Sequence, residues 1–320
     1  MPDAALPPAR PGPPLVVANP MASGLADAGR RRRVVAAMVA AVERRTGQTP
    51  VVADTTAEVA RAALTGARDA ELVVVAGGDG TIRDVAERLI GSGVPMAIVP
   101  AGTANVFGAE LGVPRRIDSA IELIGTGRPM SVDVGLATWG LATDRGPGEP
   151  TGSRAFVVAC GLGFDARVMA GATPELKRQL GFGAYLVSAA RQAARLRPVD
   201  FRIEADGVLH EFRGLIVLIA NCGQIVPRLV GPRRPIDPTD GFLEVIVIRA
   251  SGRTGGLVGL AEVLLHDADP HMRPRSVRLR ARTVRVTADP PEPAQVDGDH
   301  HETDWLAAEC VPAGLRVLRP

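Results

Sequence analysis

Hydrophobic patterning divides the chain into two parts with different periodicities. In the first part, short uninterrupted runs of Val, Ile and Ala alternate with longer segments in which apolar residues recur at helical spacing. Uninterrupted apolar runs are typical of parallel strands whose sheet is covered by helices on both faces. The pattern predicts four such strands, at Leu15–Ala18, Pro50–Ala53, Glu71–Ala76 and Pro95–Val99.

The segments between and after these strands carry helical patterns. The predicted helices are Arg31–Arg45, Thr56–Leu64, Ile82–Ile90, Asn105–Leu111 and Arg116–Ile124. Regular alternation of strand and helix indicates an α/β fold with a Rossmann-like parallel sheet, which we assign to residues 15–129.

Strand-like segments, many of them alternating, dominate the chain after this domain. They are Met130–Thr138, Ala155–Gly161, Phe201–Ala205, Phe212–Ala220, Phe242–Arg249, Val277–Ala281 and Val284–Ala288. We therefore expect residues 130–304 to form a second, mostly antiparallel β-sandwich domain. Two helices, Tyr185–Leu196 and Gly255–Leu265, interrupt it, and a flexible insert is expected at residues 145–153.

The two ends of the chain are assigned by composition and by position. Residues 1–14 are rich in proline and lack the features of a signal peptide, so we expect a disordered tail. Residues 305–320 are a candidate for completing the first domain.

Composition excludes several classes of function. The net charge is only +2 and aromatic residues make up 3% of the chain, which argues against nucleic acid as a partner. The single lysine, Lys177, lies far from every glycine-rich turn, so neither a Walker loop nor a kinase strand lysine is present. Three scattered cysteines, at 160, 222 and 310, indicate a reducing compartment, and no apolar run is long enough for a membrane helix. We expect a soluble, cytoplasmic protein.

Candidate chemistry gathers in three polar turns that follow the first, third and fourth predicted strands. These turns are residues 19–29, Ala76–Thr81 and Pro100–Asn105. In open α/β sheets, ligands bind beyond the carboxyl ends of the strands, where helix N-termini and backbone amides favour phosphate. Glycines in the second turn would let the backbone approach a phosphate closely. Asp79 would need a divalent ion between its carboxylate and that phosphate.

Local structural roles are the alternatives for individual residues of these turns. Thr81 followed by Asp84 resembles a capping box, so Thr81 could simply cap a helix. Asn19 could bond its own turn, and Ser23 could be solvated. The position of all three turns after strands favours a shared ligand site.

Six motifs, in order, resemble those of the diacylglycerol kinase catalytic domain, as found in soluble bacterial lipid kinases. They are Gly77-Gly78-Asp79-Gly80-Thr81, Pro100-Ala101-Gly102-Thr103-Ala104-Asn105, Asp133-Val134-Gly135, Gly163-Phe164-Asp165, Asp240-Gly241-Phe242-Leu243-Glu244-Val245 and Asp297-Gly298. The first motif is shared with NAD kinases and phosphofructokinases. The second motif and the late Asp-Gly pair favour the lipid kinases.

The resemblance implies an ATP site in a cleft between a nucleotide-binding domain and a lipid-binding β-sandwich domain. The residues that it places around the nucleotide are Asn19, Ser23, Thr55, Gly77, Gly78, Asp79, Gly80, Thr81, Thr103, Asn105 and Asp133. It implies Asp297 as general base and Asp299 as a second catalytic carboxylate. Phosphoryl transfer also needs an ion that neutralises the phosphate oxygens, and Asp79 could hold this catalytic Mg²⁺. A structural Mg²⁺ site is implied at Asp237, Asp240 and Phe242.

The chain departs from the family pattern at three places. Asp299 stands where the family usually has Glu, Arg83-Asp84 replaces Asn-Glu, and Val158 replaces a frequent Asn. We weigh three functions. The motifs favour an ATP-dependent lipid kinase, and the shared first motif keeps an NAD kinase as an alternative. Because the first departure shortens a catalytic carboxylate, the third is a catalytically weakened nucleotide- or lipid-binding protein.

Other charged segments have simpler interpretations. The cluster Asp297, Asp299, His300, His301 and Asp304 could suggest zinc, but adjacent residues of an extended segment point to opposite faces, so we expect solvated side chains. The helix Tyr185–Leu196 could be an ordinary amphipathic helix with solvated arginines. Alternatively, its arginines could form a membrane-facing rim, which those of the segment Pro227–Pro235 could extend. We expect a lipid substrate, peripheral membrane contact and a homodimer as a candidate assembly.

Overall fold

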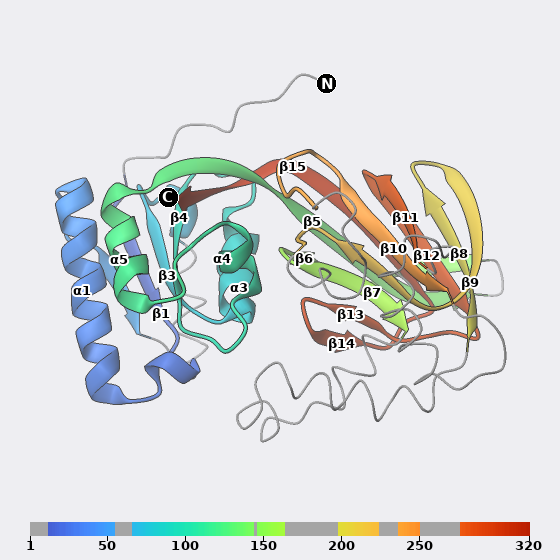
Figure 1. The fold of residues 1–320 in the computed structure, drawn as a ribbon, viewed down its shortest axis with the longest axis horizontal. Coiled ribbons are helices and arrows are strands. Elements are labelled where there is room, and N and C mark those ends of the chain that lie inside the picture. Colours follow the sequence, from blue (N-terminus) through green and yellow to red (C-terminus); the bar gives the residue numbers. More distant parts are fainter. Residues whose placement is uncertain (1–11, 55–65, 144–145, 164–197, 224–235, 250–275) are drawn as a thin grey trace, which may run out of the picture. The chain divides into compact units, whose positions relative to one another are not determined.

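The computed structural model describes residues 12–54, 66–143, 146–163, 198–223, 236–249 and 276–320. The chain divides into two compact units, one of Met1–Val134 with Pro312–Pro320 and one of Gly135–Val311. It passes from one unit to the other within β5 (Arg128–Thr143) and again within β15 (Trp305–Arg319) (Figure 1).

The first unit is built on a parallel sheet. The strands β4 (Pro95–Pro100), β3 (Val73–Gly77), β1 (Leu15–Ala18) and β2 (Val51–Asp54) lie in that order, and every pair is parallel. All residues of β1 and β3 are buried, as an uninterrupted apolar run requires. The end of β15 adds a further parallel neighbour through the pair Arg316 and Pro95. The predicted parallel α/β sheet is confirmed.

In the described part of this unit, four helices and two short 3-10 turns accompany the sheet. They are η1 (Ser23–Leu25), α1 (Ala28–Thr46), η2 (Ala67–Asp69), α3 (Asp79–Leu89), α4 (Val106–Glu110) and α5 (Ile117–Thr126). Helix α1 starts three residues earlier than predicted because the carboxylate of Asp27 accepts from the backbone N–H of Arg30 and caps it. Gly47 ends α1 in the left-handed conformation. The predicted helix Thr56–Leu64 lies outside the described residues.

Helices α1 and α5 lie side by side and run in the same direction (Figure 1). Near the end of α1, a guanidinium nitrogen of Arg45 donates to the carbonyl oxygens of Ile124 and Gly127 at the end of α5, at 2.9 and 3.1 Å. Their N-terminal ends therefore both lie toward the edge of the sheet where β1 and β4 end.

The second unit is antiparallel. Its strands are β6 (Gly146–Phe156), β7 (Ala159–Gly163), β8 (Val199–Ala205), β9 (Val208–Ala220), β10 (Leu243–Arg249), β11 (Ser276–Ala281), β12 (Thr283–Asp289), β13 (Ala294–Val296) and β14 (Asp299–His301), with the first parts of β15 and the end of β5. Each strand pairing recorded in this unit is antiparallel. Phe156, Phe201 and Val217 belong to its buried apolar core. The predicted antiparallel domain is confirmed, while the helices Tyr185–Leu196 and Gly255–Leu265 lie outside the described residues.

The expected flexible insert at residues 145–153 is wrong. Most of it belongs to β6, which pairs with β5 from Gly135 opposite Phe156 to Trp139 opposite Gly152. Glycine and proline made the segment resemble a loop, but both are tolerated in an edge strand and at register shifts. Among the described residues β6 pairs only with β5, and the register shifts at Gly140.

Candidate functional site

The three predicted turns form one connected backbone structure at a single edge of the first unit's sheet. They follow β1, β3 and β4, which are neighbouring strands. The N–H of Gly24 donates to the carbonyl of Ala101 at 2.8 Å, and the N–H groups of Ala101 and Gly102 donate to the carbonyl of Gly77 at 2.9 and 3.1 Å. Turns separated by many residues in the sequence are therefore held at fixed positions next to one another.

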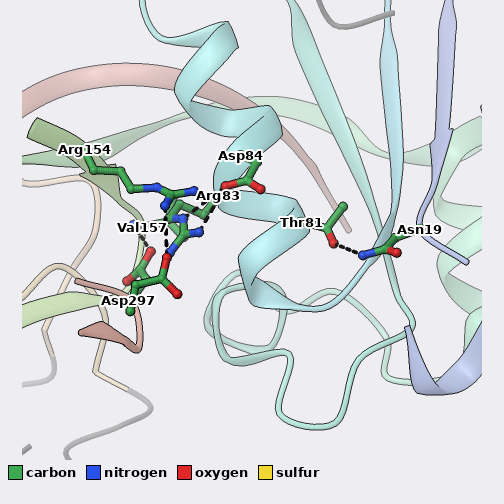
Figure 2. Close-up of polar contacts among 8 residues, drawn as sticks. Asn19, Thr81, Arg83, Asp84, Arg154, Val157 and Asp297 are labelled. Atoms are coloured by element: carbon green, nitrogen blue, oxygen red, sulfur yellow. Dashed lines mark hydrogen bonds and ion pairs between the residues drawn. The ribbon is translucent and has the colours of Figure 1, made fainter. Parts of the chain in front are cut away.

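Asn19 and Thr81 connect the first turn to the second by their side chains (Figure 2). The Asn19 amide nitrogen donates to the Thr81 hydroxyl at 2.7 Å, and the Asn19 oxygen accepts from the N–H of Met21 within its own turn. The capping role considered for Thr81 is wrong, because α3 begins at Asp79 with Gly78 as N-cap and without a capping side chain. Thr81 lies inside the first helical turn, where its hydroxyl joins the other turn.

The glycines of these turns fall into two groups. A Cβ atom on Gly77 would lie 2.6 Å from the Thr81 Cβ, and one on Gly102 would lie 2.4 Å from the Gly78 Cα, so close packing of the chain explains these glycines. Gly80 differs, since a Cβ there would meet no described atom within 4 Å. Glycine in a helix costs roughly 0.5–1 kcal/mol relative to alanine. Gly80 therefore leaves open space that no contact in the described part of the protein requires.

Asp79 joins the second turn to the third. It is the first residue of α3, and its Oδ1 accepts from the backbone N–H of Phe107 at 3.2 Å. Burial raises the pKa of the Asp79 carboxyl, although N–H groups at the start of α4 oppose that rise. A partly buried carboxylate at this position has the hard oxygen atoms that Mg²⁺ prefers.

The remaining candidates on the turns differ in their surroundings. Asn105 has φ 49°, and its amide both accepts from the N–H and donates to the carbonyl of Gly102, so it fixes the third turn. The Ser23 hydroxyl lies 3.4 Å from the carbonyl of Ala101, and Thr103 is exposed. Thr55 lies outside the described residues.

Asp133 is buried in β5 and is 1% exposed. Its Oδ1 accepts from the backbone N–H of Ala313 at 2.7 Å, and Ala313 has a positive φ of 50°. This contact ties β5 to the chain's last strand within the first unit. The implied place of Asp133 near the nucleotide stays a prediction.

In the second unit, Asp297 and Gly298 form the two-residue turn of the hairpin between β13 and β14. Both residues have positive φ, 44° and 88°, as a type I′ hairpin turn requires. The Asp297 carboxylate turns back onto the segment before β7, where Oδ2 accepts from Val157 N–H at 2.8 Å (Figure 2). Its Oδ1 accepts from the N–H groups of Val158 and Ala159 at 3.0 and 2.9 Å.

Three further residues surround this hairpin. Asp299 pairs with Arg154 of β6, with Oδ2 and Nη1 3.0 Å apart. Asn221 is fully buried and donates from its amide to the carbonyl of Val157 at 3.1 Å. Burial, with the charge of Asp297 as the second cause, raises the pKa of the Cys160 thiol, which therefore stays protonated. Sequence patterns did not single out Arg154 or Asn221, because each contacts a segment far away in the chain.

The loop considered for a structural Mg²⁺ is closed by its own contacts. Asp237 Oδ1 accepts from the N–H and hydroxyl of Thr239 at 3.0 and 2.7 Å. Asp240 Oδ1 accepts from Phe242 N–H, and its Oδ2 lies 2.7 Å from Nη2 of Arg280, whose guanidinium also stacks on the Phe242 ring. Oxygen ligands of the right kind are present, but Arg280 already supplies a positive charge to Asp240. The magnesium site stays a prediction. An ion bound there would compete with Arg280 for the carboxylate of Asp240.

The acidic and histidine cluster near the chain's end shows no zinc site. Within the described ranges no group of three or more His, Cys, Asp or Glu side chains could hold a metal ion. His301 stacks on Trp139 with ring centroids 3.9 Å apart, and His300 lies 3.5 Å from Glu302. The expectation that the side chains of this cluster are solvated is wrong for Asp297, Asp299 and His301, because each has a protein partner in the folded chain.

Family comparisons agree with this arrangement of two units. The family model of the diacylglycerol kinase catalytic domain matches residues 13–137, and that of the YegS C-terminal NAD kinase beta sandwich-like domain matches residues 157–319. The chain belongs to the YegS-like lipid kinase family. The three turns lie within the first match and the Asp297 hairpin lies within the second.

Individual relatives support the same assignment. A Pseudomonas aeruginosa protein named "Probable lipid kinase YegS-like" is 30% identical over 252 residues, which are 78% of this chain and 76% of that protein. An uncharacterized Synechocystis protein is 27% identical over 250 residues, and the match spans 78% of this chain but only about half, 54%, of that protein. The crystal structure of a diacylglycerol kinase from Bacillus anthracis has a TM-score of 0.72 at 20% identity and covers 96% of this chain and 97% of its own, which shows a shared fold.

Proposed function

We propose that this lipid kinase transfers the γ-phosphate of ATP to a hydroxyl group of a lipid such as diacylglycerol. The observation that carries the proposal is Gly80, which leaves open space at the first turn of α3 beside three turns joined by backbone hydrogen bonds. Helix N-termini and successive backbone N–H groups favour bound phosphate, and a residue without a side chain lets the phosphate approach. The nucleotide phosphates would bind at these turns, near Asn19, Thr81 and Thr103.

The charges available for phosphate in this site differ from those of lysine-based kinases. The only lysine of the chain is Lys177, so backbone N–H groups and Mg²⁺ would compensate the phosphate charge. Bound Mg²⁺ supplies positive charge to the phosphate oxygens, and Asp79 is the residue that would hold it. Binding of a cation would also favour the ionised form of Asp79, which burial alone disfavours.

The reaction would proceed by direct transfer between the two substrates. The lipid hydroxyl oxygen forms a bond to the γ-phosphorus, the bond between that phosphorus and the β,γ-bridging oxygen breaks, and ADP leaves. The hydroxyl proton passes to the carboxylate of Asp297, the proposed general base. Three backbone N–H donors hold this carboxylate in one orientation, which is what a positioned base requires. Asp299 is paired with Arg154, and this pair would help to orient the hairpin that carries Asp297.

NAD kinase is the alternative that shares the first motif. A yeast NADH kinase structure resembles the chain with a TM-score of 0.57 at 11% identity, covering 98% of this chain and 84% of that one, and this similarity concerns the fold alone. A third alternative is a protein that binds nucleotide or lipid but has little activity, because Asp299 is shorter than the usual Glu. The family matches favour a lipid acceptor.

The acceptor can be identified with ATP labelled at the γ-phosphate. The protein is incubated with Mg²⁺, diacylglycerol in mixed micelles and NAD, and the label is measured in the lipid phase and in NADP. Label in the lipid phase is expected. Label in NADP would replace the proposal by the NAD kinase alternative, and ATP binding without transfer would indicate the weakened protein.

A lipid substrate also implies work at a membrane surface. No helix in the described part of the chain has the length and hydropathy to span a bilayer. We propose peripheral contact with the membrane, with a homodimer as the candidate assembly. The two arginine-containing segments expected to face the membrane, residues 185–196 and 227–235, lie outside the described residues.

A further inference from the structure

A separate cavity lies between the N-terminal ends of α1 and α5. Its volume is about 840 Å³, which lies within the range of pockets that bind small molecules. The first and third turns contribute Ser23, Gly24, Pro100, Ala101, Gly102 and Asn105 to its wall, but no residue of Gly77–Thr81 lines it. The cavity is therefore a neighbour of the proposed nucleotide site and lacks that site's central motif.

Positive charge dominates the lining of this cavity. Arg30 and Arg33 enter it from α1, and Arg115 and Arg116 enter it from the segment before α5. All four arginines are exposed, and no ion pair within the described ranges involves them. The single acidic residue of the lining is Asp118. Guanidinium groups gathered in a concave site bind phosphate groups well because each can donate two parallel hydrogen bonds.

The two helices add to this positive potential. They run in the same direction, so the positive ends of both helix dipoles lie at the cavity. Asp27 caps α1 at the N–H of Arg30, but α5 has no capping side chain at its N-terminus. Backbone N–H groups at the start of α5 can therefore donate to an anion in the cavity.

Part of the lining is apolar, which narrows the class of ligand. Val34 and Ile121 are buried beneath the cavity, and Ala37 and Ile117 complete this side. An inorganic anion would leave such a surface unused. We propose that the cavity binds the phosphate group of a phosphorylated organic molecule, as a site distinct from that of the nucleotide. A soluble phosphomonoester and a phosphomonoester lipid headgroup share this chemistry.

The test compares two double variants that remove the same charge. Arg30→Gln with Arg115→Gln changes the cavity, whereas Arg32→Gln with Arg44→Gln changes exposed arginines of α1 that do not line it. Each protein is titrated calorimetrically with glycerol 3-phosphate and sedimented with phosphatidylcholine vesicles that do or do not contain phosphatidic acid. Thermal melting checks that both variants are folded.

The proposal expects the unaltered protein to bind at least one of these two probes. The cavity variant should bind it at least tenfold more weakly, and the control variant should stay within twofold. Binding of glycerol 3-phosphate in the titration identifies a soluble ligand. Sedimentation of the protein only with vesicles that contain phosphatidic acid identifies a lipid headgroup. Absence of binding to both probes, or equal weakening in both variants, would overturn the proposal.

Binding of a non-hydrolysable ATP analogue separates this cavity from the nucleotide site. The cavity variant should bind the analogue with unchanged affinity. An equal loss of analogue binding would overturn the proposal by making the cavity part of the nucleotide site. Binding of the phosphate probes does not depend on catalysis, so a failed lipid kinase assay would leave this result unaffected.

Discussion

Two hairpins in the second unit have the same turn but different surroundings. Asp206-Gly207 joins β8 to β9 and Asp297-Gly298 joins β13 to β14, and all four residues have positive φ. In each turn the aspartate carboxylate accepts backbone N–H groups from another segment: Arg282 and Thr283 donate to Asp206, and Val157–Ala159 donate to Asp297. An Asp-Gly pair is thus explained by hairpin geometry alone, and the dipeptide by itself does not identify a catalytic residue.

The hydrogen bonds of the two carboxylates differ in one respect. The shortest contacts of Asp206 converge on Oδ1, at 2.8 Å from Thr283 N–H and 2.9 Å from Arg282 N–H. At Asp297 the two oxygens accept from different donors, Oδ2 from Val157 and Oδ1 from Val158 and Ala159, whereas Asp206 Oδ2 accepts only a second, longer contact of 3.2 Å from the Arg282 N–H that already bonds Oδ1. An asparagine could replace Asp206 with its oxygen in the Oδ1 position, but at residue 297 its NH₂ group would face the Val157 N–H. The local structure therefore depends on the second carboxylate oxygen more strongly at Asp297 than at Asp206.

The largest expected difference is in the rate of lipid phosphorylation by Asp297→Asn and by Asp206→Asn. If Asp297 is the general base, Asp297→Asn should lower the transfer rate by about 10²- to 10⁴-fold, the usual contribution of such a group. Asp206→Asn should stay within twofold of the unaltered protein. Binding of the non-hydrolysable ATP analogue should be nearly unchanged in both, because the base acts on the acceptor hydroxyl.

Stability must be measured together with these rates. The donor facing Val157 N–H should lower the stability of Asp297→Asn by about 1–3 kcal/mol, the cost of an unsatisfied buried hydrogen-bonding group. Rates are therefore compared below the melting temperature of both variants. A folded Asp297→Asn protein that keeps its analogue binding and its transfer rate would remove Asp297 from the mechanism.

The first unit offers a second matched pair, in which one glycine is explained by local contacts and the other is not. Gly102→Ala should destabilise the protein by about 1–3 kcal/mol through overpacking, because the new Cβ would lie 2.4 Å from the Gly78 Cα. Gly80→Ala should stabilise it by roughly 0.5–1 kcal/mol, since its Cβ would meet open space in a helix. Urea unfolding measures both effects, and a destabilised Gly80→Ala protein would contradict the interpretation of this glycine.

The glycines of the two hairpins should respond equally. Gly207 and Gly298 have φ 79° and 88°, so an alanine at either position would be forced into the left-handed region at a cost of about 1–2 kcal/mol. Chemical unfolding of Gly207→Ala and Gly298→Ala should give values that agree within error. A clearly larger loss at one position would show that its turn is held by more than hairpin geometry.

The smallest expected effect concerns acid sensitivity at Asp206. Burial raises the pKa of this carboxyl, but the N–H groups of Thr283 and Arg282 outweigh it, and the net pKa is lowered from 3.8. A lowered pKa stabilises the fold fully above the unfolded carboxyl's value and loses that contribution as pH falls through the folded value. The difference in melting temperature between the unaltered protein and Asp206→Asn should therefore shrink below about pH 4. A difference that does not change with pH would contradict this assignment.

Uninterrupted apolar runs allowed the parallel sheet to be predicted, because buried strands of this kind leave a signal in every residue. The turns between them were predicted as a group, since parallel strands place their carboxyl ends at one edge. The role of Thr81 was not predicted, because its hydroxyl accepts from the amide of Asn19, which lies 62 residues away in the chain.

Long-range contacts account for most of the other differences. The pairs Arg154 with Asp299 and Arg280 with Asp240 join segments whose proximity depends on strand order. Strand β6 was mistaken for a loop because glycine and proline content carries no information about the partner strand β5. The two hairpins did have a local signal in the sequence, because an Asp-Gly pair between extended segments is typical of a hairpin turn. Neither hairpin was predicted from it.

Calorimetric titration with a non-hydrolysable ATP analogue and Mg²⁺ tests the central claim, that the three joined turns hold the nucleotide's phosphates, most directly. The claim predicts that Gly80→Ala binds the analogue at least tenfold more weakly than the unaltered protein, although the variant is at least as stable. Equal affinity in the two proteins would contradict it, because the open space at Gly80 would then have no part in binding phosphate.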